Sequence, residues 1–334
     1  MLGPQNFYNR LDHHHAECKD WVVVNWNLGN MCNFSCSYCP SILNDGSFGW
    51  NDFDVVKNFI NATAEHYAPK KVYFEFTGGE VTLWKDFIKC AEYITEIGHH
   101  IGFISNGSRT LRWWKKNKTK FNHVCLSYHP EEGDHQHFID VVNIMSQQCR
   151  THVNVMMHND PTIWPRCQDV AEAVISIPNI SLALQPLIVD FGEVLFNYTE
   201  EQTIYIDRQW HNLASKIEHT KEWPVYRGSM RMHDDVNELS QAHGAHIFIN
   251  DKTNNWKGWM CWSGLEQIVV DFDGSVLIGW CRVGGPIGNM KQPQNIKWPD
   301  KPIMCTKSMC HCNFDIMSKK VLPENRYEVL EDPT

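Results

Sequence analysis

The sequence predicts an α/β protein: a partial (β/α)6 TIM-like barrel, followed by a small C-terminal subdomain made of a β-hairpin and a cysteine-rich tail. Over residues 21–219, apolar strand-like runs alternate with helix-like stretches, which is typical of parallel β-α units. Residues 267–281 read instead as two strands joined by an Asp-Gly turn, with cysteines before and after them. The chain has 334 residues, 43% of them hydrophobic, which is enough to bury one large core and a small appendage.

The order of the elements follows from this alternation. Six strands are expected, at residues 21–27, 72–76, 101–104, 123–127, 152–157 and 180–185. Helices are expected at residues 52–66, 83–97, 109–118, 136–149, 167–175 and 200–218. The implied domains are an N-terminal extension (1–20), the barrel (21–219), a bridging segment (220–257) and the C-terminal subdomain (258–334). In a parallel barrel the active site lies at the carboxyl ends of the strands, so the residues that follow each strand are candidates for function.

Composition narrows the class of protein. The net charge is −9, from 30 basic and 39 acidic residues, so we expect no nucleic-acid partner. The sequence shows neither a signal peptide nor a membrane span, and we expect a cytoplasmic protein without a membrane partner. In a reducing cytoplasm the 13 cysteines would stay reduced, which leaves them free to bind metal.

Three of these cysteines, Cys32, Cys36 and Cys39, follow the first predicted strand with the spacing C-x3-C-x2-C. Three thiolates in eight residues can hold three corners of an iron-sulfur cube and leave its fourth iron open. Structural zinc sites use paired C-x2-4-C knuckles, and this triplet fits that pattern poorly. The spacing therefore favours a 4Fe-4S cluster that binds something else.

Two further motifs follow predicted strands. Gly78-Gly79-Glu80 comes directly after the second strand, where paired glycines allow close approach to a ligand and a carboxylate suits an ammonium group. Ser105 and Asn106 follow the third strand in a Ser-Asn-Gly turn. Each motif alone also reads as a plain turn.

Together, the cysteine triplet with Tyr38 before its last cysteine, the Gly-Gly-Glu segment and the Ser-Asn-Gly turn resemble the radical S-adenosylmethionine (radical SAM) superfamily. The resemblance implies that the open iron chelates SAM and that Glu80 meets the SAM amino group. It also implies contacts to SAM from Tyr38, Gly78, Gly79, Ser105 and Asn106, and from Ser127 after the fourth strand. A reductant such as flavodoxin or ferredoxin is implied as a partner.

A second cysteine group lies near the C-terminus. The hairpin over 267–281 is expected to bring Cys261 and Cys281 side by side, and Cys305, Cys310 and Cys312 follow in the tail. This arrangement looks like the SPASM or twitch extension of radical SAM enzymes, which holds an auxiliary 4Fe-4S cluster. The tail has C-x4-C-x-C instead of the usual SPASM spacing, and five cysteines exceed the four that one cluster needs. We therefore expect one auxiliary cluster, on Cys261, Cys281 and Cys310 with either Cys305 or Cys312, and zinc is the alternative metal.

The expected function is that of a radical SAM enzyme, which cleaves SAM reductively and abstracts hydrogen from a small molecule or peptide. Oxidoreductase, peptide-modifying enzyme and mutase all stay open, because a fold and its cofactor do not name the reaction. In the bridging segment, Tyr226, Arg227, Arg231 and His233 are candidates to reach substrate. The alternative is a non-catalytic iron-sulfur or zinc protein for electron transfer or scaffolding, which would not need the Gly-Gly-Glu segment.

Overall fold

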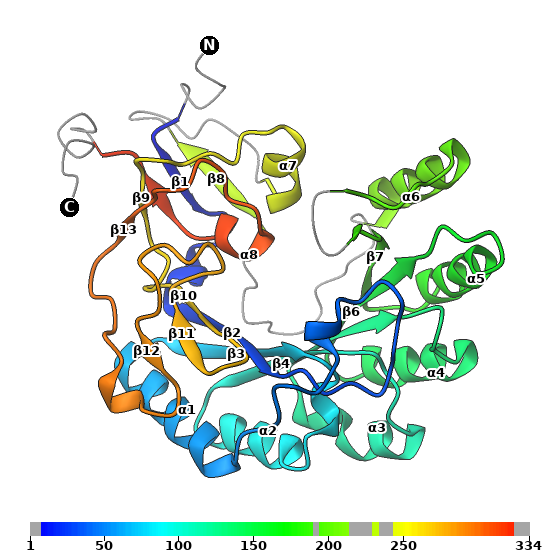
Figure 1. The fold of residues 1–334 in the computed structure, drawn as a ribbon, viewed down its shortest axis with the longest axis horizontal. Coiled ribbons are helices and arrows are strands. Elements are labelled where there is room, and N and C mark those ends of the chain that lie inside the picture. The colour runs from blue at the N-terminus through cyan, green and yellow to red at the C-terminus, as the bar shows by residue number, and fades with distance from the viewer. Residues whose placement is uncertain (1–7, 190–193, 214–228, 234–242, 324–334) are drawn as a thin grey trace. The chain divides into compact units, whose positions relative to one another are not determined.

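The fold is taken from a computed structural model that describes residues 8–189, 194–213, 229–233 and 243–323. The chain divides into two compact units (Figure 1). The first consists of residues Met1–Asn25, Asp54–Tyr73 and Pro224–Thr334, and the second of Trp26–Phe53 and Phe74–Trp223. Strands β2 (Trp21–Gly29) and β3 (Lys71–Gly78) contribute residues to both units.

The second unit is the α/β part of the chain. From the second halves of β2 and β3, its strands continue in the order β4, β5, β6, β7, and β4 to β7 pair in parallel. The strands are β4 (His100–Ser105), β5 (His123–Tyr128), β6 (Arg150–Met157) and β7 (Ile180–Pro186). The helices are α2 (Phe87–Glu96), α3 (Leu111–Asn117), α4 (His135–Ser146), α5 (Trp164–Ile175) and α6 (Glu200–Leu213). This mixed α/β unit with a parallel sheet confirms the predicted partial barrel.

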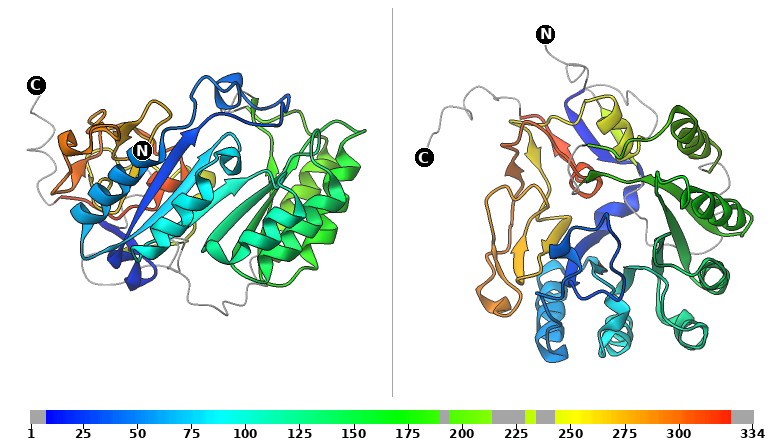
Figure 2. Two further views of the ribbon diagram at one scale, coloured as in Figure 1. Left: turned by 90° about the horizontal axis from the view of Figure 1, so that it is seen from below. Right: turned by 45° about the vertical axis from the view of Figure 1, so that its right-hand side comes forward.

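Helices cover one side of these strands, as Figures 1 and 2 show. The alternation along β6 explains why: Val153 and Val155 are fully buried, whereas the alternating residues His152 and Asn154 are half-buried on the opposite face. Two of the covering helices, α3 and α4, begin at a side-chain cap. The side chain of Asp134 accepts a hydrogen bond from the backbone N–H of His137 at the start of α4, and Thr110 caps α3 in the same way.

The first unit contains an antiparallel five-stranded sheet in the order β13, β9, β14, β1, β8. These strands are β1 (Arg10–His13), β8 (Met230–His233), β9 (Met260–Cys261), β13 (Ile303–Met304) and β14 (Lys320–Val321). The unit also holds β10 (Gln267–Val270), β11 (Ser275–Leu277) and β12 (Gly288–Asn289), with helices α1 (Phe53–Tyr67), α7 (Ala245–Asn250) and α8 (Asn313–Ile316). Its core is aromatic, with Trp256, Trp259 and Phe248 packed around Leu11 and Ile316.

Several predicted boundaries shift. The helix expected from residue 83 begins at Phe87, because Val81–Leu83 form a separate 3-10 turn, and the helix expected from residue 167 begins earlier, at Trp164. The expected hairpin is present as β10 and β11, and β12 adds a third strand to it. Tyr226 and Arg227 lie outside the described residues, as do positions 214–218 of the last predicted helix. Among the described residues, no helix has the length and apolar character needed to cross a membrane.

Candidate functional site

The loop that carries the first three cysteines leaves the end of β2 and is closed at its base by Asn30, a fully buried residue. The Nδ2 atom of Asn30 donates to the carbonyl of Ile42 and to Oδ1 of Asp45, each at 2.7 Å, and its Oδ1 accepts from the N–H of Phe48 at 2.8 Å. One amide therefore holds both ends of the loop. This role could not be predicted from the sequence, because an isolated asparagine after a strand carries no recognisable pattern.

Gly79 lies directly against the backbone of this loop. Its N–H donates to the carbonyl of Gly29 at 2.9 Å, and the N–H of Glu80 donates to the carbonyl of Met31 at 2.8 Å. A Cβ atom at position 79 would lie 2.2 Å from the carbonyl oxygen of Met31, so only glycine fits there. The preceding Gly78 has φ of 131°, which also favours glycine. The glycine pair thus seats the start of the cysteine loop on the end of β3.

Glu80 is fully buried, and both of its carboxylate oxygens are engaged within the protein. Oε1 accepts from the hydroxyl of Ser105 at 2.9 Å and from the N–H of Thr82 at 3.2 Å, and Oε2 accepts from the N–H of Asn106 at 2.7 Å. Burial raises the pKa of Glu80, although these hydrogen bonds oppose the shift. In this structure Glu80 joins the end of β3 to the end of β4.

Asn106 is the residue that connects this strand end to the cysteines. Its Nδ2 donates to Oδ1 of Asn33 at 3.2 Å and lies 3.9 Å from Sγ of Cys32. The backbone N–H of Phe34 also donates to that sulfur, at 3.4 Å. Donors directed at a sulfur favour its thiolate form, which is the form that binds iron.

The three thiols occupy a partly apolar environment. Cys36 is buried and packs with Tyr38 and Leu187, and Cys32 and Cys39 are half-buried. Burial raises the pKa of all three thiols, that of Cys36 to about 12, and the neighbouring thiolates raise it further. A positively charged iron centre would remove this penalty, so the donor set fits a cluster.

Residues 129–132, which follow β5, form hydrogen bonds with the loop that carries the three cysteines. Glu131 accepts from the N–H of Ser37 at 2.6 Å and from its hydroxyl, and Glu132 accepts from the hydroxyl of Ser35 at 2.8 Å. The hydroxyl of Tyr38 is hydrogen-bonded to Nδ1 of His129 at 2.9 Å. Residues between the cysteines, and not only the cysteines, are therefore fixed by the strand ends of this unit.

His129 and Tyr38 also stack, with ring centroids 6.0 Å apart and an interplanar angle of 7°. Burial lowers the pKa of His129 to about 4, so its ring is neutral near pH 7. The position of His129 after the fourth predicted strand marked it as a candidate, whereas Glu131 and Glu132 carried no sequence signal. Ser127, another expected cofactor contact, is buried on β5, where it lies opposite Asn154 in the strand register.

The second cysteine group lies in the first unit and lines one pocket. Four thiols face it, those of Cys261, Cys281, Cys305 and Cys310, together with Asp315 and Lys320. Cys261 comes from β9 and lies outside the hairpin, so β9 and its sheet partners bring it to Cys281. Burial raises the pKa of each of Cys281, Cys305 and Cys310.

The fifth cysteine of this group, Cys312, has a different position. It is the N-cap residue of α8, and its sulfur accepts a hydrogen bond from the N–H of Asp315 at 3.3 Å. It is absent from the described residues that line the pocket. The sequence left Cys305 and Cys312 as alternatives; Cys305 lines the pocket, and Cys312 lies close enough to Cys310 to raise its pKa.

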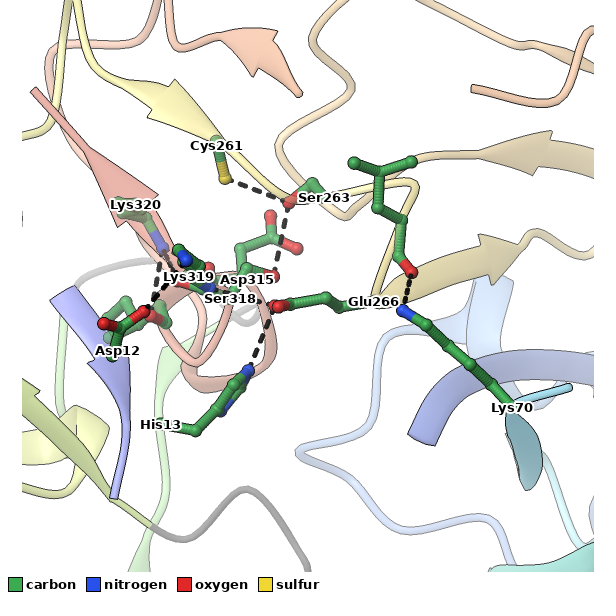
Figure 3. Close-up of polar contacts among 12 residues, drawn as sticks. Asp12, His13, Lys70, Cys261, Ser263, Glu266, Asp315, Ser318, Lys319 and Lys320 are labelled. Atoms are coloured by element: carbon green, nitrogen blue, oxygen red, sulfur yellow. Dashed lines mark hydrogen bonds and ion pairs between the residues drawn. The ribbon is translucent and has the colours of Figure 1, made fainter. Parts of the chain in front are cut away.

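Asp315 organises the pocket from α8. Its Oδ2 accepts from the N–H of Cys281 at 2.6 Å, and its Oδ1 accepts from the N–H of Trp280 and from Nε2 of Gln267, each at 3.0 Å. A Cβ atom on Gly279 would lie 2.6 Å from this Oδ1. Figure 3 shows Asp315 beside Lys320, Ser263 and Cys261. In the described part of the chain, no three His, Cys, Asp or Glu side chains are arranged to hold a single metal ion.

Comparison with known proteins gives matches of two kinds. Residues 26–129 match the family model of the Radical SAM superfamily. A segment of the chain is 30% identical over 99 residues to GTP 3',8-cyclase of Actinobacillus succinogenes, a match that covers 27% of this chain and 28% of that protein. The chain thus matches well under two thirds of the length of this relative.

The fold is similar to that of SuiB of Streptococcus suis. With SuiB bound to its precursor peptide SuiA, the TM-score is 0.54 at 10% identity, covering 84% of this chain and 65% of that one. With SuiB bound to S-adenosylmethionine, the TM-score is 0.51 at 10% identity, covering 84% and 66%. At this level of identity the likeness shows a common fold only.

Proposed function

We propose that the chain is a radical SAM enzyme with a 4Fe-4S cluster on Cys32, Cys36 and Cys39, because residues 26–129 match the family model of the Radical SAM superfamily. The observation that carries the proposal is the anchoring of all three thiols on one loop, which contacts the ends of β3, β4 and β5. When bound, the cluster and SAM supply hydrogen-atom abstraction by a 5'-deoxyadenosyl radical. Cys32, Cys36 and Cys39 would hold the cluster by three of its irons, which would leave the fourth available to SAM.

In this proposal the chain's own residues orient and enclose the cofactors. The backbone at Gly78 and Gly79 gives SAM close access, and Ser105, Asn106, Tyr38 and Ser127 supply polar contacts. Glu80 is assigned as a positioning residue, because its oxygens hold Ser105 and Asn106 in place. The family resemblance also implies that the amino group of SAM meets Glu80, whose Oε2 accepts one hydrogen bond, from Asn106, and can accept a second.

We assign the auxiliary site to Cys261, Cys281, Cys305 and Cys310, as ligands of a second 4Fe-4S cluster. Four thiols around one pocket supply the donor number that a closed cluster needs. Zinc bound by four of these cysteines is the alternative.

The substrate is proposed to be a small molecule or a peptide. The GTP 3',8-cyclase relative is named for a nucleotide, and SuiB was solved with its precursor peptide, so both classes occur among similar proteins. A reductant such as flavodoxin or ferredoxin would reduce the first cluster, and a cytoplasmic location fits this chemistry.

The decisive experiment is anaerobic reconstitution with iron and sulfide, followed by SAM and dithionite. We expect 5'-deoxyadenosine to form, and we expect none from the Cys32→Ala/Cys36→Ala/Cys39→Ala variant. A fully iron-loaded wild-type protein that forms no 5'-deoxyadenosine would refute the enzyme proposal and leave an electron-transfer or scaffold role.

A further inference from the structure

Lys320 is a lysine that is almost wholly buried, with 1% of its surface exposed, at the start of β14. Its Nζ donates to three backbone carbonyls, those of Asp315 at 2.8 Å, Ser318 at 2.9 Å and Ile316 at 3.0 Å. A neutral amine has only two N–H bonds, so three donated hydrogen bonds require the ammonium form. The Nζ atom also lies 4.7 Å from the ring centroid of Trp256, which favours a cation.

This buried cation lacks a carboxylate partner at ion-pair distance among the described residues. Its neighbour Lys319 is the contrast, because Nζ of Lys319 lies 3.3 Å from Oδ1 of Asp12. The carboxylate of Asp315 accepts from the N–H groups of Trp280 and Cys281; it is not within ion-pair distance of Lys320, although the charge of Lys320 lowers its pKa against the rise that burial causes. A buried charge is costly unless an opposite charge compensates it.

The thiols beside Lys320 can supply the compensating negative charge. Lys320 lines the same pocket as the thiols of Cys261, Cys281, Cys305 and Cys310. An iron-sulfur cube with four thiolate ligands is an anion, and reduction adds a further negative charge to it. A fixed cation beside the pocket therefore stabilises the bound cluster, and it stabilises the reduced form more than the oxidised form.

We propose that Lys320 is the built-in counter-ion of the second cysteine site and raises the reduction potential of the cluster held there. This inference rests on the proposed auxiliary cluster. The positive charge of Lys320 acts on the cluster held by the cysteines. Lys320 is therefore a positioning residue and not a catalytic one. In line with this role, burial raises the pKa of Cys305 and Cys310, and the charge of Lys320 opposes that rise for both thiols.

The test uses the full chain with Cys32→Ala/Cys36→Ala/Cys39→Ala, in which only the second site can hold iron. Lys320→Met removes the charge at similar length, and Lys319→Met is the matched control on the adjacent residue. After anaerobic reconstitution, iron content and an EPR-monitored redox titration are measured. We expect a lower midpoint potential for Lys320→Met and an unchanged one for Lys319→Met. An unchanged potential in iron-loaded Lys320→Met would overturn the proposal.

A second measurement decides the proposal in case Lys320→Met does not fold or does not take up iron. Lys320→Gln keeps N–H donors for the carbonyls without the charge, and zinc alone serves as the probe, with retention measured against a chelator. We expect Lys320→Gln to hold zinc about tenfold more weakly than the background protein, since partners of metal ligands have effects of this size. Equal retention would overturn the role of Lys320. A background protein that takes up zinc but no iron would instead refute the auxiliary cluster, and the zinc result would still decide the role of Lys320.

Discussion

At the scale of single residues, Gly79 shows how narrowly the first site is built. We predict that Gly79→Ala displaces the cysteine loop, because the added Cβ would lie 2.2 Å from the carbonyl oxygen of Met31 and 2.5 Å from its carbonyl carbon. Backbone atoms cannot rotate away as a side chain can. We expect a loss of about 1–3 kcal/mol in the free energy of unfolding, typical of overpacking. The iron bound by Cys32, Cys36 and Cys39 should be lost with it.

The control for this prediction is Gly49→Ala, since an added Cβ at Gly49 meets no atom within 4 Å. Thermal unfolding and iron analysis of both variants provide the measurement. Gly49→Ala should keep its iron and its stability. A Gly79→Ala protein with full iron content and normal formation of 5'-deoxyadenosine would show that the loop does not depend on this contact.

At the scale of elements, the strands of the barrel and the hairpin β10–β11 were predictable, whereas the shortest strands of the first unit were not. The strand expected at 123–127 is β5 (His123–Tyr128), and that expected at 152–157 is β6 (Arg150–Met157). These runs are long and buried on at least one face, so their composition is constrained. Strands such as β9 and β14 have two residues each, too few to show any periodicity. Their pairing depends on contacts between distant parts of the chain.

The loop after β5 gives a prediction for an element that sequence reasoning did not find. We predict that Glu131→Ala loosens the cysteine loop, because Glu131 accepts two hydrogen bonds from Ser37 and lies 3.3 Å from Nε2 of His158. Hydrogen bonds to a charged group contribute about 1.5–3 kcal/mol each when sheltered, and partial exposure of this loop reduces that value. Iron loss to a chelator should therefore become about tenfold faster.

Glu172→Ala is the matched control, because Glu172 is an exposed glutamate on α5, away from the described contacts of the loop. Its rate of iron loss should equal that of the wild type. If Glu131→Ala released iron no faster than Glu172→Ala, the carboxylate contacts would not restrain the loop. Circular dichroism of both variants would show that the comparison is made between folded proteins.

At the scale of the whole molecule, the sequence located both cysteine groups but not all of their surroundings. The spacing of Cys32, Cys36 and Cys39 is a local pattern, so it can be read directly. Other residues come close to the cysteine groups only when the chain folds, and no motif marks their positions. They are Asn30, Glu131 and Lys320. Cys305 and Cys312 looked equivalent in the sequence; in the structure Cys305 lines the pocket, whereas Cys312 is the N-cap residue of α8.

Iron counting tests this whole-molecule assignment. A chain with two 4Fe-4S clusters should bind about eight irons, and Cys32→Ala/Cys36→Ala/Cys39→Ala should retain about four. In that background we expect Cys305→Ala to lose most of the remaining iron, because Cys305 lines the pocket. Cys312→Ala should keep it, because the sulfur of Cys312 caps α8. Loss of iron from Cys312→Ala with retention in Cys305→Ala would reverse the assignment of the fourth ligand.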